Sequence, residues 1–210
     1  MKIRCRLLIA LLMLPPLVAG CDAITALDEA SQPLEIYELQ TPSVQKRASG
    51  RNVELVVEEP ASGGALATER IMIRPAPLRA QYYPGVRWAD TTPIMLQTLM
   101  VRSLIETGAF RSVGRRPVGS AADYAVLSEL TDFEAIPTGQ GSTTVRVRLI
   151  FRLVRESDAT VIATRAFTAT EEAGGTDIGA VVRAFDRATS ALLLNAVGWI
   201  VGLATQPASG

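Results

Sequence analysis

One stretch of the chain alternates between apolar and mostly basic side chains, and it restricts the fold more than any other feature. Its apolar members are Val145, Val147, Leu149, Phe151 and Leu153, and the positions between them include Arg146, Arg148 and Arg152. Successive side chains of a β-strand point to opposite faces of the sheet. The alternation therefore predicts a strand with one face in the core and one polar, accessible face, which is typical of an antiparallel sheet.

The segments around this strand predict the remaining architecture. Glu156, Ser157 and Asp158 form a turn, and residues 160–170 return as the second arm of a hairpin. Thr92-Pro93 predicts the start of an amphipathic helix that Gly108 ends, and a longer helix is expected to begin near Thr176-Asp177. Shorter strands are expected at 36–39, 53–57, 71–73 and 123–133. We therefore expect an α+β fold: a single domain with a mainly antiparallel sheet and two principal helices packed on one face.

The N-terminus has the pattern of a bacterial lipoprotein signal. Lys2, Arg4 and Arg6 precede an apolar run, which ends in Leu17-Val18-Ala19-Gly20-Cys21. The pattern predicts a signal peptide over 1–20, fatty acyl chains on Cys21, a tether over 21–33, the folded domain over 34–203 and a disordered tail over 204–210. The alternative is an ordinary signal peptide with Cys21 left as a free thiol.

Composition argues against several classes of function. Residues 1–20 hold three basic and no acidic residues, so their removal takes the formal charge from zero to about −3, which argues against nucleic acid as a partner. The chain contains no histidine, and its two cysteines are Cys5 and Cys21. Histidine-dependent catalytic triads and the usual zinc ligand sets are therefore excluded. We nominate no catalytic, cofactor-binding or metal-binding residue and expect no enzyme.

Several segments together resemble a known family. They are the lipobox, Tyr37-Glu38-Leu39, the segment Arg87-Trp88-Ala89-Asp90 leading into a helix, Asp123-Tyr124-Ala125-Val126, the arginine-bearing hairpin and the long last helix. In this order they resemble the ABC-type transport auxiliary lipoproteins, the paraquat-inducible protein C-like family. The chain departs from the family pattern at Gln81-Tyr82-Tyr83-Pro84-Gly85 and in having aspartate rather than glutamate at position 90.

The resemblance implies a non-catalytic accessory subunit in the bacterial cell envelope, anchored through the acyl chains on Cys21 and facing the periplasm. Its implied partners are a mammalian-cell-entry-type substrate-binding protein and an ABC permease and ATPase that move phospholipid. The choice between the inner and the outer membrane stays open. The alternatives are an outer-membrane assembly or peptidoglycan-synthase-activating lipoprotein, and a carboxylate-dependent hydrolase, which would need two buried, facing carboxylates.

Four side chains are candidates for a partner surface. They are Arg146, Arg148 and Arg152 on the polar face of the predicted strand, and Trp88, which either presents an aromatic face or fills the core. The second half of the last helix, from Ala191 onward, is apolar nearly all round but too short to span a membrane. It is expected to be buried in the core or against a partner, or to lie at a lipid interface.

Overall fold

The computed structural model describes residues 34–47, 50–117, 119, 121–139 and 141–205. The predicted signal peptide, Cys21 and the tether lie outside these residues. The described chain forms one compact unit from Leu34 onward.

Three long strands make up most of the main sheet, and the last two of them form the predicted hairpin. They are β8 (Tyr124–Gly139), β9 (Ser142–Arg155) and β10 (Thr160–Ala173). β9 pairs antiparallel with both neighbours, and the sheet order is β10-β9-β8-β2-β7. The five alternating apolar residues of β9 are all fully buried, whereas Arg148 and Arg152 are exposed.

Short strands occupy the other edge of β8, and they correct the expectation of a mainly antiparallel sheet. The strands are β2 (Arg51–Val57), β3 (Ala61–Ser62), β4 (Met72–Ala76), β5 (Arg79–Tyr82) and β7 (Phe110–Gly114). β2, β3 and β4 follow one another along β8, each parallel to it, and β7 runs parallel to β2. Within the described residues, four of the seven pairings in this sheet are parallel, so the sheet is mixed.

A separate two-stranded sheet brings together two of the segments that carried the family resemblance. β1 (Glu35–Tyr37) pairs in parallel with β6 (Val86–Trp88), with Tyr37 beside Trp88. The backbone N–H of Ala89 donates to the carbonyl of Tyr37 at 2.8 Å, which extends the pairing past the strand end.

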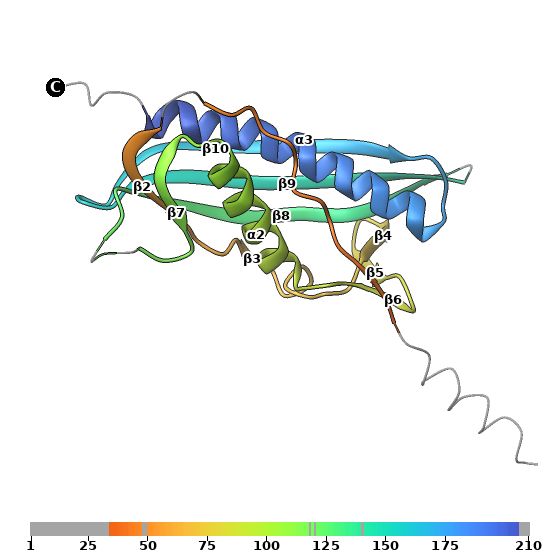
Figure 1. Ribbon diagram of the computed structural model, residues 1–210. Coiled ribbons are helices and arrows are strands. Elements are labelled where there is room, and N and C mark those ends of the chain that lie inside the picture. Colours follow the sequence, from red (N-terminus) through yellow and green to blue (C-terminus); the bar gives the residue numbers. More distant parts are fainter. Residues whose placement is uncertain (1–33, 48–49, 118, 120, 140, 206–210) are drawn as a thin grey trace, which may run out of the picture. The chain divides into compact units, whose positions relative to one another are not determined.

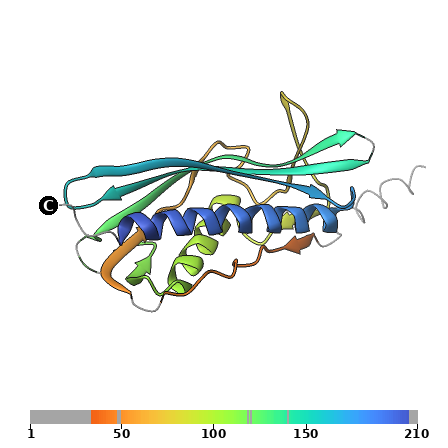
Figure 2. The same ribbon diagram turned by 90° about the horizontal axis from the view of Figure 1, so that it is seen from above.

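Both helices lie on the same face of the main sheet, as expected (Figures 1 and 2). α2 (Thr92–Glu106) carries Pro93 in its first turn and is followed by Gly108, whose φ of 63° is in the left-handed region that favours glycine. α3 (Ile178–Ala204) begins after Asp177, whose carboxylate accepts from the backbone N–H of Ala180 at 2.8 Å.

α3 reaches further than predicted, since Ala204 is helical and both Ala204 and Thr205 are buried. These two residues therefore belong to the domain and not to a tail; the remainder of that predicted tail, 206–210, is outside the described residues. By length and composition α3 could cross a membrane, but half of its most apolar window is buried inside the protein. The helix packs along β9 and β10, and the apolar face that it turns toward these strands accounts for its high apolar content.

A β-bulge in β8 decides which of its side chains enter the core. The register against β9 shifts between Leu130 and Asp132. Before the shift, Val126 and Leu130 are buried on the helix side; after it, Phe133 and Ala135 take that role. Because one extra residue reverses the alternation of a strand, Asp132 and Glu134 point to the opposite face.

Candidate functional site

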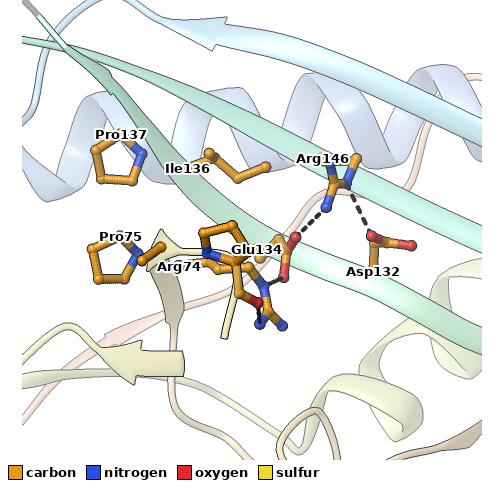
Figure 3. A pocket seen from close by; sticks show the side chains of 9 residues that line it. Arg74, Pro75, Asp132, Glu134, Ile136, Pro137 and Arg146 are labelled. Carbon is orange, nitrogen blue, oxygen red and sulfur yellow. Dashed lines mark hydrogen bonds and ion pairs between the residues drawn. The ribbon is translucent and has the colours of Figure 1, made fainter. Parts of the chain in front are cut away.

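The outer face of the sheet, opposite the helices, contains a hollow of about 570 Å³ beside the β4–β5 hairpin. Figure 2 shows that this hairpin projects from the face that the helices leave uncovered. The walls of the hollow are mainly apolar and its floor is charged, and Figure 3 shows both. Its lining residues are Arg74, Pro75, Ala76, Pro77, Asp132, Glu134, Ile136, Pro137 and Arg146.

Glu134 is the centre of the charged floor, with only 2% of its side chain exposed. Its Oε1 accepts from Nη2 of Arg146 at 2.5 Å, and its Oε2 accepts from Nε of Arg74. Nε of Arg146 also donates to Oδ1 of Asp132 at 2.9 Å. Two arginines thus connect β4, β8 and β9 through one buried carboxylate and one half-buried carboxylate (Figure 3).

The bulge in β8 is the local reason for this cluster. Without it, Asp132 and Glu134 would share a face with Leu130 and would lie under the helices. The hydroxyl of Thr131, at the bulge, donates to Oδ2 of Asp132 at 2.9 Å and lies 3.4 Å from the backbone carbonyl oxygen of Arg148. The bulge therefore delivers two carboxylates to the face on which Arg146 lies.

The chemistry of the hollow is that of a neutral, satisfied ion cluster. Each oxygen of Glu134 accepts a hydrogen bond from a guanidinium group. The two carboxylates match the two arginines in charge, so the floor offers no surplus charge to an ionic ligand. Apolar walls and a paired charged floor are features that a structural role or contact with a partner would use.

The predicted arginine face divides into two kinds of residue. Arg146 is held by Asp132 and Glu134, with 40% of its side chain exposed. Arg148 and Arg152 are exposed, and neither forms an ion pair with any residue that the structure describes. Of the three, only Arg148 and Arg152 are free to contact another molecule without losing an internal partner.

Trp88 is a core residue, which corrects its nomination for a partner surface. Its side chain has no exposed area, and its ring lies edge-on to Phe133 at 5.8 Å and to Phe185 at 5.4 Å between centroids. The indole N–H finds no hydrogen-bond partner among the described residues. β6 carries Trp88 under the sheet, so its aromatic surface is used in folding. Cys21, the predicted lipidation site, lies outside the residues that the structure describes.

Sequence reasoning missed Asp132, Glu134 and Arg74. A signal was present, because the acidic residues at 132 and 134 mirror the basic residues at 146 and 148 across the turn between β8 and β9, a pairing that was not predicted from the sequence. Opposite charges on facing positions of paired strands stabilise a sheet. The facing positions could be matched only with knowledge of the bulge in β8, and no sequence pattern predicted that bulge.

Comparison with protein families gives one match over most of the domain. The profile described as "ABC-type transport auxiliary lipoprotein component" matches residues 37–195. This range begins in β1 and ends within α3, so it includes the hollow and the arginine face.

Individual proteins are also similar to this chain. An uncharacterized protein of Bradyrhizobium diazoefficiens is 25% identical over 186 residues, which cover 88% of this chain and 49% of that protein. The chain thus spans about half the length of this curated relative. A crystal structure from Xanthomonas campestris, of the family DUF330, is 28% identical with a TM-score of 0.72, covering 80% of this chain and 95% of the other. A hypothetical protein from Chlamydia trachomatis shares the fold at 7% identity and a TM-score of 0.53, covering 74% and 99%.

Proposed function

Since the chain belongs to the family of ABC-type transport auxiliary lipoprotein components, we propose that it is the lipid-anchored accessory subunit of a transport system that moves phospholipid in the bacterial envelope. In this proposal it faces the periplasm and binds a mammalian-cell-entry-type substrate-binding protein together with its ABC permease and ATPase. It acts by binding and not by catalysis.

The observation that carries this proposal is the family match, which covers the folded domain from β1 to α3. The arrangement of the domain supports it. Both helices cover one face of the sheet, so the other face remains open for a partner, with Arg148 and Arg152 exposed on it. In the outer hollow, Glu134 is held by two arginines, which fixes the surface around it for contact with a partner.

The anchor is tested at Cys21. Its thiol is the acyl attachment point that the N-terminal pattern offers. We expect Cys21→Ala to move the protein from the detergent phase to the aqueous phase in phase partitioning of whole envelopes. Retention of the variant in membranes after a high-salt wash, at the wild-type level, would show that another segment holds it there.

The partner surface is tested by charge reversal. The double variant Arg148→Glu with Arg152→Glu reverses two unpaired charges on the outer face. A matched control, Arg102→Glu with Arg183→Glu, makes the same change in net charge on exposed positions of α2 and α3. Chemical crosslinking in intact envelopes, followed by identification of captured proteins, measures association.

We expect the outer-face variant to lose most of its crosslinks to the substrate-binding protein while the control keeps them, because charges at the edge of an interface act on encounter and specificity. Thermal melts of both variants check that the domain remains folded. Capture of peptidoglycan synthases or outer-membrane assembly factors alone would instead favour the alternative function. Equal crosslinking by both variants would remove the arginine face from the proposal.

A further inference from the structure

β10 is an unpaired edge of the main sheet. It pairs with β9 along one side, and among the described residues no strand pairs with its other side. The outward backbone N–H and carbonyl groups of a strand in this position are available to another strand. With 14 residues, β10 is long for an edge.

The middle of this edge lacks the features by which proteins usually prevent pairing. Natural edges are interrupted by proline, by bulges or by charged side chains. A register shift between Val161 and Ala163 interrupts the start of β10. From Ala163 to Thr170 the strand has no proline, no glycine and a single charge, that of Arg165. Threonine and phenylalanine, which favour strands, make up half of this segment.

The helix side of the same edge is hollowed. A space of about 470 Å³ is lined by Arg165, Ala166, Phe167, Thr168, Asn195 and Trp199. The guanidinium of Arg165 lies 5.0 Å from the ring centroid of Phe167 and forms no ion pair with any described residue. The edge therefore offers backbone hydrogen bonds, a recess beside Phe167 and Trp199, and one unpaired positive charge.

We propose that this edge binds the same edge of a second copy of the chain, with the two β10 strands antiparallel about a twofold axis at Thr168. A continuous sheet with the helices of both copies on one side requires a register centred on a residue, because side chains alternate between faces. When the register is centred on Thr168, Arg165 of each copy lies directly opposite Glu171 of the other copy.

The neighbouring registers lose this charge match. Centred on Phe167, Arg165 would face Ala169; centred on Ala169, it would face Ala173. Opposite charges on directly facing positions stabilise paired strands, and like charges destabilise them. Glu171 keeps 36% of its side chain exposed beside Arg187, whose Nε lies 3.2 Å from Oε2, so its carboxylate has room for a second guanidinium.

Disulfide capture in intact envelopes tests the axis. Thr168 is exposed, and its register partner on β9 is Arg148, one strand further in and on the same face. After oxidation with copper–phenanthroline, Thr168→Cys should give a disulfide-linked dimer on non-reducing gels. The matched control Arg148→Cys and the wild-type chain, which carries Cys5 and Cys21, should not. A Thr168→Cys yield no higher than that of the control would overturn the proposal.

Charge exchange tests the register. In the Thr168→Cys background, Arg165→Glu alone and Glu171→Arg alone each place like charges opposite one another twice, and should reduce the dimer by about fivefold or more. When the two variants are produced together, both opposite-charge pairs return, and a mixed dimer should form at the level of the Thr168→Cys chain. Unchanged yields in the single variants, or capture of a different protein in place of a second copy, would contradict the proposed pairing.

Discussion

Reversing the charge of Arg146 should destabilise the domain, although the residue lies on the accessible face of the sheet. The effect follows from Glu134, which is 2% exposed and is held by Arg146 and Arg74. Arg146→Glu removes one of the two cations from this buried carboxylate and adds a like charge beside it. Breaking a buried ion pair by changing one partner costs about 3–5 kcal/mol.

The lower end of that range is expected here. Arg74 stays on Glu134, and Arg146 itself is 40% exposed, so solvent screens part of the interaction. The additional pair with Asp132 contributes less than the pair with Glu134, because Asp132 is less buried than Glu134 and the Arg146 side chain is 40% exposed. We therefore expect the free energy of unfolding to fall by about 3 kcal/mol, which lowers Tm by roughly 6–12 °C for a domain of this size.

The control is Arg152→Glu, six residues further along the same face of β9. Arg152 has no ion-pair partner in the described part of the chain, and its register neighbours are Leu127 and Thr164. Its reversal should change the free energy of unfolding by no more than about 0.5 kcal/mol. Arg146→Lys should be intermediate, because an ammonium keeps the charge but lacks the planar fork that bonds two carboxylates.

Thermal and urea unfolding of the chain from residue 34 onward measures all three variants. If Arg146→Glu and Arg152→Glu melt within about 2 °C of each other, Glu134 does not depend on Arg146, and the cluster is not a structural element. The same result would restore Arg146 to the accessible partner surface.

Three further outcomes test other parts of the structure. Phe151→Arg should leave the domain unfolded in circular dichroism, because Phe151 is fully buried and an unpaired buried charge costs as much as a domain's whole stability. Gly50→Ala should lower Tm, since an added Cβ would lie 2.6 Å from the carbonyl oxygen of Gly108, whereas Gly64→Ala, with open space around it, should not. The backbone N–H of Thr160 donates to the carboxylate of Asp158 and holds the pKa of Asp158 below its ordinary value of 3.8. Ionised Asp158 therefore stabilises the fold above that pH. The stability lost in Asp158→Asn should therefore be full at neutral pH and shrink as the pH falls below about 4; a loss that is independent of pH would contradict this account.

The long elements of the fold could be predicted because their patterns repeat over many residues. β9 repeats its alternation over its whole length, and α2 and α3 carry helical spacing with recognisable ends at Pro93, Gly108 and Asp177. The parallel pairings of β2, β3 and β4 could not be predicted, since these strands have two to seven residues and take their partners from the distant β8. A partial signal existed in β2, where Leu55, Val56 and Val57 are all buried. A continuous apolar run of this kind is typical of a parallel strand covered on both faces.

The candidate site was predictable in its location but not in its partners. The alternation of β9 placed Arg146, Arg148 and Arg152 on the correct face. It could not separate the paired Arg146 from its free neighbours, because the pairing depends on a bulge in another strand and on Arg74 from a third. Trp88 was ambiguous for a similar reason, since its burial follows from the β1–β6 pairing.

The bulge at Thr131 also means that β8 follows two opposite rules along its length. Up to Leu130, even-numbered positions face the helices and odd-numbered positions face outward; beyond the bulge, odd positions such as Phe133 face the helices. A saturation scan of substitutions along β8 should therefore show a requirement for apolar side chains that switches from even to odd positions at residue 131. A homologous strand that lacked the inserted residue, aligned to β8 without a gap, would have its core positions paired with surface positions on one side of residue 131. The inserted residue is thus the point at which any alignment to this chain has to be checked for a change of face.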